Sequence, residues 1–398
     1  MPGSSGPGIV RCMRDGQSAE AVQILDDLIA EAVRSGASDI HLEPKEHRLA
    51  VRFRVDGVLV NRRPYPVDKA SGVLARVKVL GKMDLAERRL PQDGTFEVSV
   101  QGRTISLRCS SFPTPYGEKM VLRLLPGGYS RPLARLGMLE DQVEVLARWV
   151  GQTSGLVLVT GPTGSGKTST LYSCLGALDA KSRNVVTLED PIEVNLPEIT
   201  QGQVNVRIGM DFARGLRHVL RQDPDVILVG EMRDLETAQI AVRASLTGHL
   251  VLSTLHTTSS VATIVRLLDM GLERHVVAGA LTGIVAQRLV RRLCPGCQSV
   301  GRPERDWSKD FGFQVAPDAL LPKAVGCPRC LHTGYRGRAG IFDVVEVDDD
   351  LRDLVRSGAS RRELKELLKD RELPTVRRRG VELVQQGVTT LSEVLRVT

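Results

Sequence analysis

The sequence predicts an α/β protein built from more than one domain. It has 398 residues, of which 42% are hydrophobic and 25% charged, a balance that excludes a disordered chain, a collagen or a coiled-coil fibre. At about 100–200 residues per domain, the length corresponds to two to four domains. In the middle of the chain, short apolar runs that end in glycines, acids or histidines alternate with helical patterns, as in a sheet covered by helices.

Charge and hydropathy limit the cellular location and the partners that the sequence allows. The formal net charge is +7, and residues 286–340 alone carry +6, either as solvated side chains beside thiolates or as a docking surface for an anionic partner. The longest mostly apolar run, Val276–Ala286, is too short for a membrane span of about 20 residues. Residues 1–8 lack the features of a signal peptide. We expect a cytoplasmic protein whose residues 1–18 form a flexible tail.

Residues 19–125 are predicted to form a compact α+β module. Helical periodicity extends from about Ser18 to Ser35 and again over about Val67–Leu80. Asp56-Gly57 favours a hairpin turn between alternating strands, and three further strand patterns follow up to Leu125. Residues 126–132, rich in glycine and proline, are predicted to be a linker and a hinge.

A phosphate-binding motif follows the linker. The buried strand Leu156–Val159 leads into G-x-x-x-x-G-K-[ST], and a helical pattern follows it, which is the context this motif requires. Its glycines let backbone N–H groups converge on phosphate oxygens, while Lys167 reaches the β and γ phosphates and Thr168 holds Mg²⁺. The predicted nucleotide-binding residues here are Gly161, Pro162, Thr163, Gly164, Ser165, Gly166, Lys167, Thr168 and Ser169.

Acidic residues follow two further strand patterns. Val185–Leu188 leads to an acidic segment that contains Glu189 and Glu193, and Val226–Val229 leads through a glycine to Glu231. Acids beyond strand ends lie at the ligand edge of an α/β sheet, although a solvated acidic turn is the alternative. A glycine occupies the usual place of the Walker B aspartate. We therefore expect Glu231 to be the residue that acts on the metal ion.

Histidines flank a fourth strand pattern, Leu250–Thr254. His256 comes after the strand and is the better candidate for the site, whereas His249 precedes it. A histidine satisfied within the core is the alternative for both. Four small helices are predicted near the end of the chain, over Asp349–Ser357, Arg361–Asp370, Thr375–Gln386 and Thr390–Arg396.

Two C-x-x-C pairs indicate a metal site. Cys294 and Cys297 are separated by 29 residues from Cys327 and Cys330, and two such pairs form a tetrahedral four-sulfur site that suits Zn²⁺. With all four positions filled by cysteine, the zinc would be structural. The alternative is two redox-active dithiols. Aromatic residues between the pairs, Trp307 among them, are expected to pack inside this module.

Several segments together resemble the secretion ATPase superfamily, and the four cysteines match its type II secretion and type IV pilus assembly members. The matching segments are Gly36–Pro44, Tyr116–Lys119, Thr187–Glu193 (the aspartate box), Arg221–Asp225, Gly230–Asp234 and Leu246–Thr257 (the histidine box). The resemblance covers about Ala19–Thr398. Members usually carry a further N-terminal domain that docks on a membrane partner, and this chain begins almost directly at the second domain.

The resemblance implies an α/β fold with four parts. These are a PAS-like α+β N-terminal domain (19–125), a RecA-like P-loop ATPase core (133–290), a tetracysteine zinc-binding module (291–340) and a small helical C-terminal region (341–398). It also implies a homo-hexamer in which ATP lies between a C-terminal domain and an N-terminal domain of the same or a neighbouring chain.

Site roles follow from the same resemblance. Glu193 would orient or deprotonate the attacking water, Glu231 would act on Mg²⁺, His256 would sense the γ-phosphate, and Glu189 would lie at the nucleotide. Spacing alone does not decide which glutamate is the base. The arginines at the positions that complete the site are Arg108, Arg123, Arg217 and Arg221. Solvated faces or local salt bridges are the alternative for each of them.

The implied function is an ATP-hydrolysing motor that powers pseudopilus assembly in type II secretion. Type IV pilus assembly and competence systems are alternatives, as are a nucleic-acid translocase and a nucleotide-gated scaffold with little turnover. Nucleic acid is disfavoured because no aromatics interleave with a basic groove. The implied partners are an inner-membrane platform protein, the cytoplasmic domain of a membrane-anchored component and anionic phospholipid, which would hold the protein at the inner membrane.

Overall fold

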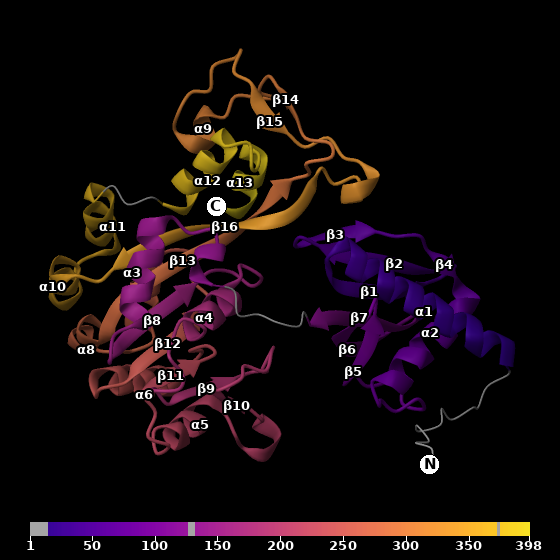
Figure 1. Ribbon diagram of the computed structural model, residues 1–398, viewed down its shortest axis with the longest axis horizontal. Helices are drawn as coiled ribbons and strands as arrows, with labels where there is room; N and C mark the ends of the chain where they lie inside the picture. The colour runs from indigo at the N-terminus through magenta and orange to yellow at the C-terminus, as the bar shows by residue number, and fades with distance from the viewer. Residues whose placement is uncertain (1–14, 126–131, 372–374) are drawn as a thin grey trace. The chain divides into compact units, whose positions relative to one another are not determined.

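The computed structural model describes residues 15–125, 132–371 and 375–398 (Figure 1). The chain divides into two compact units, Met1–Gly127 and Gly128–Thr398. Most of the predicted tail and linker lies outside the described residues. Within the described part, no helix is both long and apolar enough to cross a bilayer.

The first unit is an antiparallel sheet with two helices, which confirms the predicted mixture of helix and sheet. Its strand order is β3-β2-β1-β7-β6-β5, and β4 pairs with β2. The core joins alternate residues of the sheet, such as Ile40 and Phe53, to Leu25 and Val73 of the helices. The elements are α1 (Asp15–Ser35), β1 (Ala37–Lys45), β2 (Arg48–Val55), β3 (Val58–Asn61), β4 (Tyr65–Pro66), α2 (Val67–Leu80), β5 (Gln92–Val100), β6 (Arg103–Thr114) and β7 (Gly117–Leu125).

The second unit is built on a sheet of order β10-β9-β11-β12-β8-β13-β16. All neighbouring strands are parallel except β13 and β16. The strands are β8 (Gly155–Thr160), β9 (Val185–Glu189), β10 (Thr200–Gln203), β11 (Val226–Val229), β12 (Leu250–Leu255), β13 (Leu281–Leu293) and β16 (Tyr335–Glu346).

Helices cover both faces of this sheet, so its strands are nearly continuous apolar runs. Along β8, Leu156 and Leu158 face one core, while Val157 and Val159 face the other. The first face is covered by α5 (Phe212–Val219), α6 (Leu235–Leu246), α7 (Ser260–Asp269) and α8 (Arg274–Ala280), and the second by α3 (Glu140–Val150) and α4 (Lys167–Leu175). Because these strands are parallel, the carboxyl ends of β8, β9, β11 and β12 lie at one edge of the sheet.

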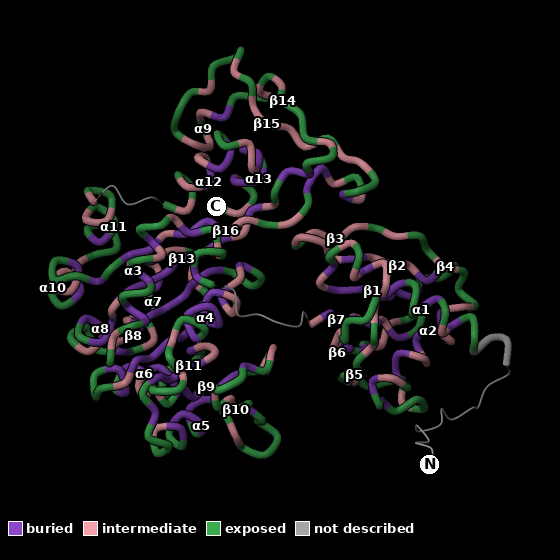
Figure 2. The backbone as a smooth tube through the Cα atoms, viewed as in Figure 1, coloured by how far each residue is buried: buried purple, intermediate pink, exposed green. Residues whose placement is uncertain are grey.

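The four-cysteine segment and the C-terminal helices share one core rather than forming separate ones. Trp307 is buried with Val290 of β13, Ile341 of β16 and residues of two C-terminal helices. The predicted boundaries at 290/291 and 340/341 fall inside β13 and β16, which both run through this region (Figure 1). Figure 2 shows that the segment around β14 and β15 is mostly exposed or half-buried.

The remaining elements lie in this region and at the end of the chain. They are β14 (Ser299–Gly301), α9 (Ser308–Phe311), β15 (Leu321–Lys323), α10 (Asp349–Ser357), α11 (Arg361–Asp370), α12 (Val376–Gln385) and α13 (Leu391–Val397), with short 3₁₀ turns at Leu133–Arg135, Val206–Ile208 and Pro328–Cys330.

Candidate nucleotide site and four-cysteine cluster

The phosphate-binding motif forms a tight loop between β8 and α4. Gly161, Gly164 and Gly166 have φ values of 153°, 79° and 92°, which side chains rarely tolerate. A Cβ atom at Gly161 would lie 2.5 Å from the Gln287 carbonyl oxygen, and one at Gly166 would lie 2.8 Å from Gln287 Nε2. Gly161 and Gly166 therefore meet a double requirement, for conformation and for close approach, and Gly164 meets the first.

Two polar groups of this loop are suited to receive phosphate. Lys167 is buried, and its Nζ donates hydrogen bonds to the carbonyl oxygens of Gly161 (2.9 Å) and Pro162 (3.2 Å). Burial lowers the pKa of Lys167, although the charge of Glu231 opposes this shift. Ser165 Oγ is buried without a hydrogen-bond partner among the described residues. Because phosphate oxygens would accept from both groups, the loop fits a bound nucleotide.

Glu231 and His256 meet at the carboxyl ends of the adjacent strands β11 and β12. His256 Nε2 lies 3.0 Å from Glu231 Oε2, and Arg233 also forms an ion pair with Glu231. Burial favours the neutral acid, but the hydrogen bonds and charges of Arg233 and His256 outweigh it and hold the pKa of Glu231 below its usual value. Glu231 is therefore a carboxylate at neutral pH, the form that binds Mg²⁺.

Glu189, the last residue of β9, and Glu193, four residues further on, differ sharply in environment. Glu189 is buried and accepts hydrogen bonds from Tyr172 Oη (2.5 Å), Thr187 Oγ1 (2.6 Å) and Gln201 Nε2 (3.1 Å). Glu193 is exposed, and its backbone N–H donates to Tyr172 Oη over 3.4 Å. Burial, followed by the hydrogen bond to Glu189, raises the pKa of Tyr172, so the phenol stays protonated.

Tyr172 was missed at the sequence level. It lies on α4, five residues after Lys167, and joins that helix to the acidic segment after β9. A buried tyrosine on a helix is ordinarily a core residue, and no spacing in the sequence indicates its contact with Glu189. The structure thus adds a direct link between two of the predicted motifs.

Two of the predicted arginines lie away from the phosphate loop of their own chain in the fold. Arg217 is in the last turn of α5 and pairs with Glu236, and Arg221 follows the end of that helix and donates to the Arg217 carbonyl oxygen (2.8 Å). The next residues contact Asn184, which precedes β9. Arg221 therefore lies at the edge where the parallel strands begin, opposite the edge that holds Glu231. His249 precedes β12 and lies at this same edge.

The other two arginines belong to the first unit. Arg108 on β6 and Arg123 on β7 are paired across the sheet, and both are exposed. Arg123 Nε donates to Asp39 Oδ1 over 2.8 Å, and Asp39 itself is buried. This hydrogen bond orients the Arg123 guanidinium on the sheet surface.

The four cysteines converge as the sequence predicts. Their Sγ atoms all lie within 4.8 Å of one another, and Cys294 to Cys327 and Cys297 to Cys330 are 3.9 and 3.8 Å apart. Tetrahedral zinc with Zn–S bonds of about 2.3 Å places its sulfur ligands about 3.8 Å apart. The backbone N–H of Gly326 also donates to Cys297 Sγ (3.3 Å), as suits a thiolate. The donor set fits zinc.

These sites occur in a known family. A family model described as type II/IV secretion system protein matches residues 15–396. The chain belongs to this family. The resemblance inferred from the motifs is therefore confirmed.

Individual members of the family are similar over nearly the whole chain. The type II secretion system ATPase E of Vibrio cholerae is 47% identical over 382 residues, which cover 96% of this chain and 76% of that protein. The type II secretion system protein E of Pseudomonas aeruginosa is 47% identical over 387 residues, covering 97% of this chain and 77% of that protein.

Solved structures show the same fold. The pilus retraction motor PilT with bound ADP is 28% identical, has a TM-score of 0.64 and covers 94% of this chain and 96% of its own. The ATPase DotB of Legionella pneumophila, at 20% identity, has a TM-score of 0.70 and covers 94% of each chain. These matches confirm the predicted α/β fold of a secretion-family ATPase.

The basic segment of this family member is partly neutralised by its own fold. Arg291 pairs with the buried Glu393 (2.7 Å), and Arg305 with Asp310 (2.9 Å). Arg288 is buried and donates to three backbone carbonyl oxygens. These arginines are held by partners within the fold, which neither of the two sequence-based interpretations, solvated side chains beside thiolates or a docking surface, describes.

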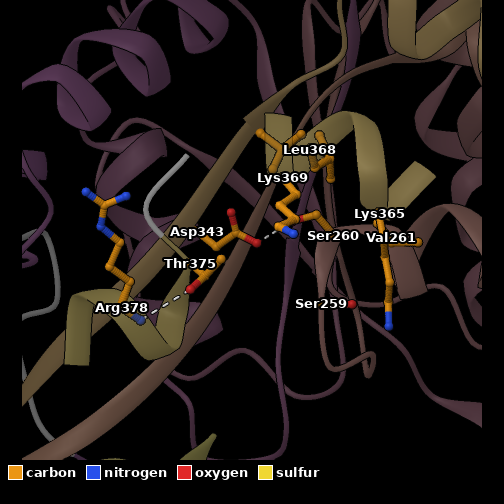
Figure 3. A pocket seen from close by; sticks show the side chains of 10 residues that line it. Ser259, Ser260, Val261, Asp343, Lys365, Leu368, Lys369, Thr375 and Arg378 are labelled. Atoms are coloured by element: carbon orange, nitrogen blue, oxygen red, sulfur yellow. Dashed lines mark hydrogen bonds between the residues drawn. The ribbon is translucent and has the colours of Figure 1, made fainter. Parts of the chain in front are cut away.

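A crevice of about 700 Å³ lies between α7, α11 and α12 and includes none of the predicted site residues (Figure 3). Inside it, Ser260 Oγ donates to Asp343 Oδ2 over 3.0 Å. Burial raises the pKa of Asp343 to about 6. The lining residues are Ser259, Ser260, Val261, Asp343, Val345, Lys365, Leu368, Lys369, Thr375 and Arg378.

Proposed function

We propose that this protein is the ATP hydrolase that powers pseudopilus assembly in a type II secretion system. The observation that carries the proposal is the meeting of the phosphate loop with Glu231 and His256 at one edge of the sheet. There, buried Lys167 and Ser165 present donors for phosphate, while Glu231 supplies a carboxylate. Relatives at 47% identity that carry type II secretion names support the assignment.

Thr168 and Glu231 would hold Mg²⁺, which would neutralise charge on the phosphates. Glu231 suits this role because Arg233 and His256 fix its position and help to keep it ionised. Glu193 would orient and deprotonate the attacking water, and it is exposed, whereas Glu189 is buried in the hydrogen-bond network of Tyr172. Glu189 would act indirectly. It accepts a hydrogen bond from Tyr172, which connects α4 to the acidic segment after β9.

The arginines point to an assembly of several copies. Arg221 lies at the sheet edge opposite Glu231, and Arg217 precedes it on α5, so in this proposal they complete the site of a neighbouring subunit. Arg108 and Arg123, on the exposed face of the first unit, supply further positive charge to the γ-phosphate. The arrangement proposed is a homo-hexameric ring.

Zinc bound by the four cysteines would be structural, because thiolates fill its coordination sphere. The proposed partners are an inner-membrane platform protein and the cytoplasmic domain of a membrane-anchored secretion component, with anionic phospholipid as a further contact. Through them the protein would act at the cytoplasmic face of the inner membrane.

Nucleotide binding and ATP turnover by the purified chain test the proposal. The wild type should bind ATP with Mg²⁺ and release phosphate, and Lys167→Ala should lose binding or turnover because its Nζ is the main cation of the loop. Lys181→Ala, an exposed lysine of the same unit, is the matched control and should behave as the wild type. Equal hydrolysis by Lys167→Ala and the wild type would refute the site.

A further inference from the structure

Gln287 of β13 lies beside the phosphate loop, although no motif includes it. β13 runs parallel to β8 with Ala286 opposite Thr160, so Gln287 lies level with the start of the loop. Its side chain is 2% exposed. A buried amide is costly unless both of its ends find partners.

Both ends of the Gln287 amide are satisfied by groups of the phosphate loop and its helix. Nε2 donates to the Ser165 carbonyl oxygen over 2.7 Å, and Oε1 accepts from Thr170 Oγ1 over 2.7 Å. The Ser165 carbonyl fixes which way the amide faces, because it can only accept and so requires Nε2 opposite it; the Thr170 hydroxyl then donates to Oε1. One side chain therefore joins the loop to the first turn of α4.

The bond to Ser165 also fixes the orientation of a peptide group in the loop. The peptide between Ser165 and Gly166 is planar and trans, so its carbonyl oxygen and its N–H point in opposite directions. With the Ser165 carbonyl directed toward Gln287, the Gly166 N–H is directed away from β13. Backbone N–H groups of such loops bind phosphate, and this one immediately precedes Lys167.

We propose that Gln287 is a positioning residue of the nucleotide site, which holds the Ser165–Gly166 peptide in the orientation that binds phosphate. Gln287 itself does not touch the nucleotide and acts through the loop. The close approach of Gly166 to Nε2, where a Cβ atom would lie only 2.8 Å away, shows that the loop is built around this amide. The inference rests on the proposed function and deepens it.

The variant Gln287→Glu removes the Nε2 donor with little change in the shape of the side chain. A carboxylate keeps the acceptor for Thr170 but cannot donate to Ser165, which would free the peptide to turn. We expect the Kd of a fluorescent ADP analogue to rise about tenfold or more at pH 8, since losing a buried hydrogen bond of this kind has about that effect. Burial raises the pKa of such a carboxyl group. At pH 6 its protonated form donates again, so the ratio of variant to wild-type Kd should fall toward one.

Gln142→Glu is the matched control. Gln142 is also buried, lies on α3 and donates to the Phe342 carbonyl oxygen (3.4 Å), but it contacts no residue of the phosphate loop. It should leave the Kd unchanged even where both variants lower the thermal midpoint. Binding by Gln287→Glu as tight as wild type at pH 8 would overturn the inference. So would an equal loss in both variants, or a loss that is the same at pH 6 and pH 8. Failure of the wild type to bind nucleotide would instead refute the proposed function.

Discussion

His256 Nε2 lies 3.0 Å from Glu231 Oε2 and so joins two motifs that are 25 residues apart in the sequence. The contact follows from topology, because β11 and β12 are parallel neighbours and each residue comes just after its strand. The charge of Glu231 also acts on Lys167, whose own burial disfavours its ammonium form. A change at Glu231 should therefore affect both His256 and Lys167.

Glu231→Gln should separate nucleotide binding from hydrolysis. The amide keeps the shape of the side chain but removes the charge that would hold Mg²⁺, while the phosphate-binding donors Lys167 and Ser165 stay in place. We expect ATP binding within about threefold of the wild type and a kcat lowered by roughly 100-fold, the size typical of losing a group that acts in the transition state. Glu144→Gln, an exposed acid on α3, is the control, and turnover near wild type for Glu231→Gln would contradict the role.

His256→Ala should slow hydrolysis chiefly through Glu231. Without the histidine, the carboxylate loses one of its two side-chain partners, and the pKa of Glu231 should rise toward the usual value. A double-mutant cycle with Glu231→Gln measures the coupling, which for residues in contact is about 0.5–3 kcal/mol. The double variant should therefore be little slower than Glu231→Gln alone. Fully additive losses in kcat would show that His256 acts independently.

The sequence was sufficient to predict the elements and motifs that depend on residues close together in the chain. The helix over Val67–Leu80 has the predicted bounds, and the loop from Gly161 lies between the predicted strand and helix. The four cysteines also meet as their spacing indicates. Each of these depends on periodicity or on short spacings within the chain.

Features that depend on contacts between distant segments were not accessible from the sequence. The apolar run Val276–Ala286 is divided between α8 and β13, because a short apolar run fits a buried helix and a buried strand equally well. Tyr172 and Gln287 acquire their roles only from the strands that reach them in the fold. Trp307, expected inside the cysteine module, packs against α12 and α13 as well, since the module has too few apolar residues for a core of its own.

Zinc binding should stabilise the cysteine module and, through Trp307, the helices packed on it. We expect about one zinc per chain in reduced protein, measured by elemental analysis. Cys327→Ser should lose the metal, lower the thermal midpoint and increase proteolysis between residues 299 and 326. Nucleotide binding should persist, because the phosphate loop makes no contact with the cluster. Cys109→Ala, a buried thiol of the first unit, should keep its zinc; zinc well below one per chain in the wild type would contradict the site.

Asp343 should make the second unit less stable as the pH rises. Burial raises the pKa of Asp343 to about 6 from an ordinary 3.8, so the folded state binds this proton more tightly than the unfolded state does. The contribution is therefore fully present below about pH 4 and is lost as the pH rises through about 6. At 1.36 kcal/mol per pKa unit, the loss is at most about 3 kcal/mol.

Asp343→Asn removes this titration while keeping an oxygen that accepts from Ser260 Oγ. Relative to the wild type, we expect a higher free energy of unfolding at pH 7.5, by up to about 3 kcal/mol, and little difference near pH 4. Urea unfolding followed by tryptophan fluorescence measures it, because Trp149 and Trp307, the chain's two tryptophans, both belong to the second unit. Asp353→Asn, an exposed acid on α10, should show the wild-type pH dependence. If Asp343→Asn were less stable than the wild type at pH 7.5, the carboxylate would be held by charges that favour it.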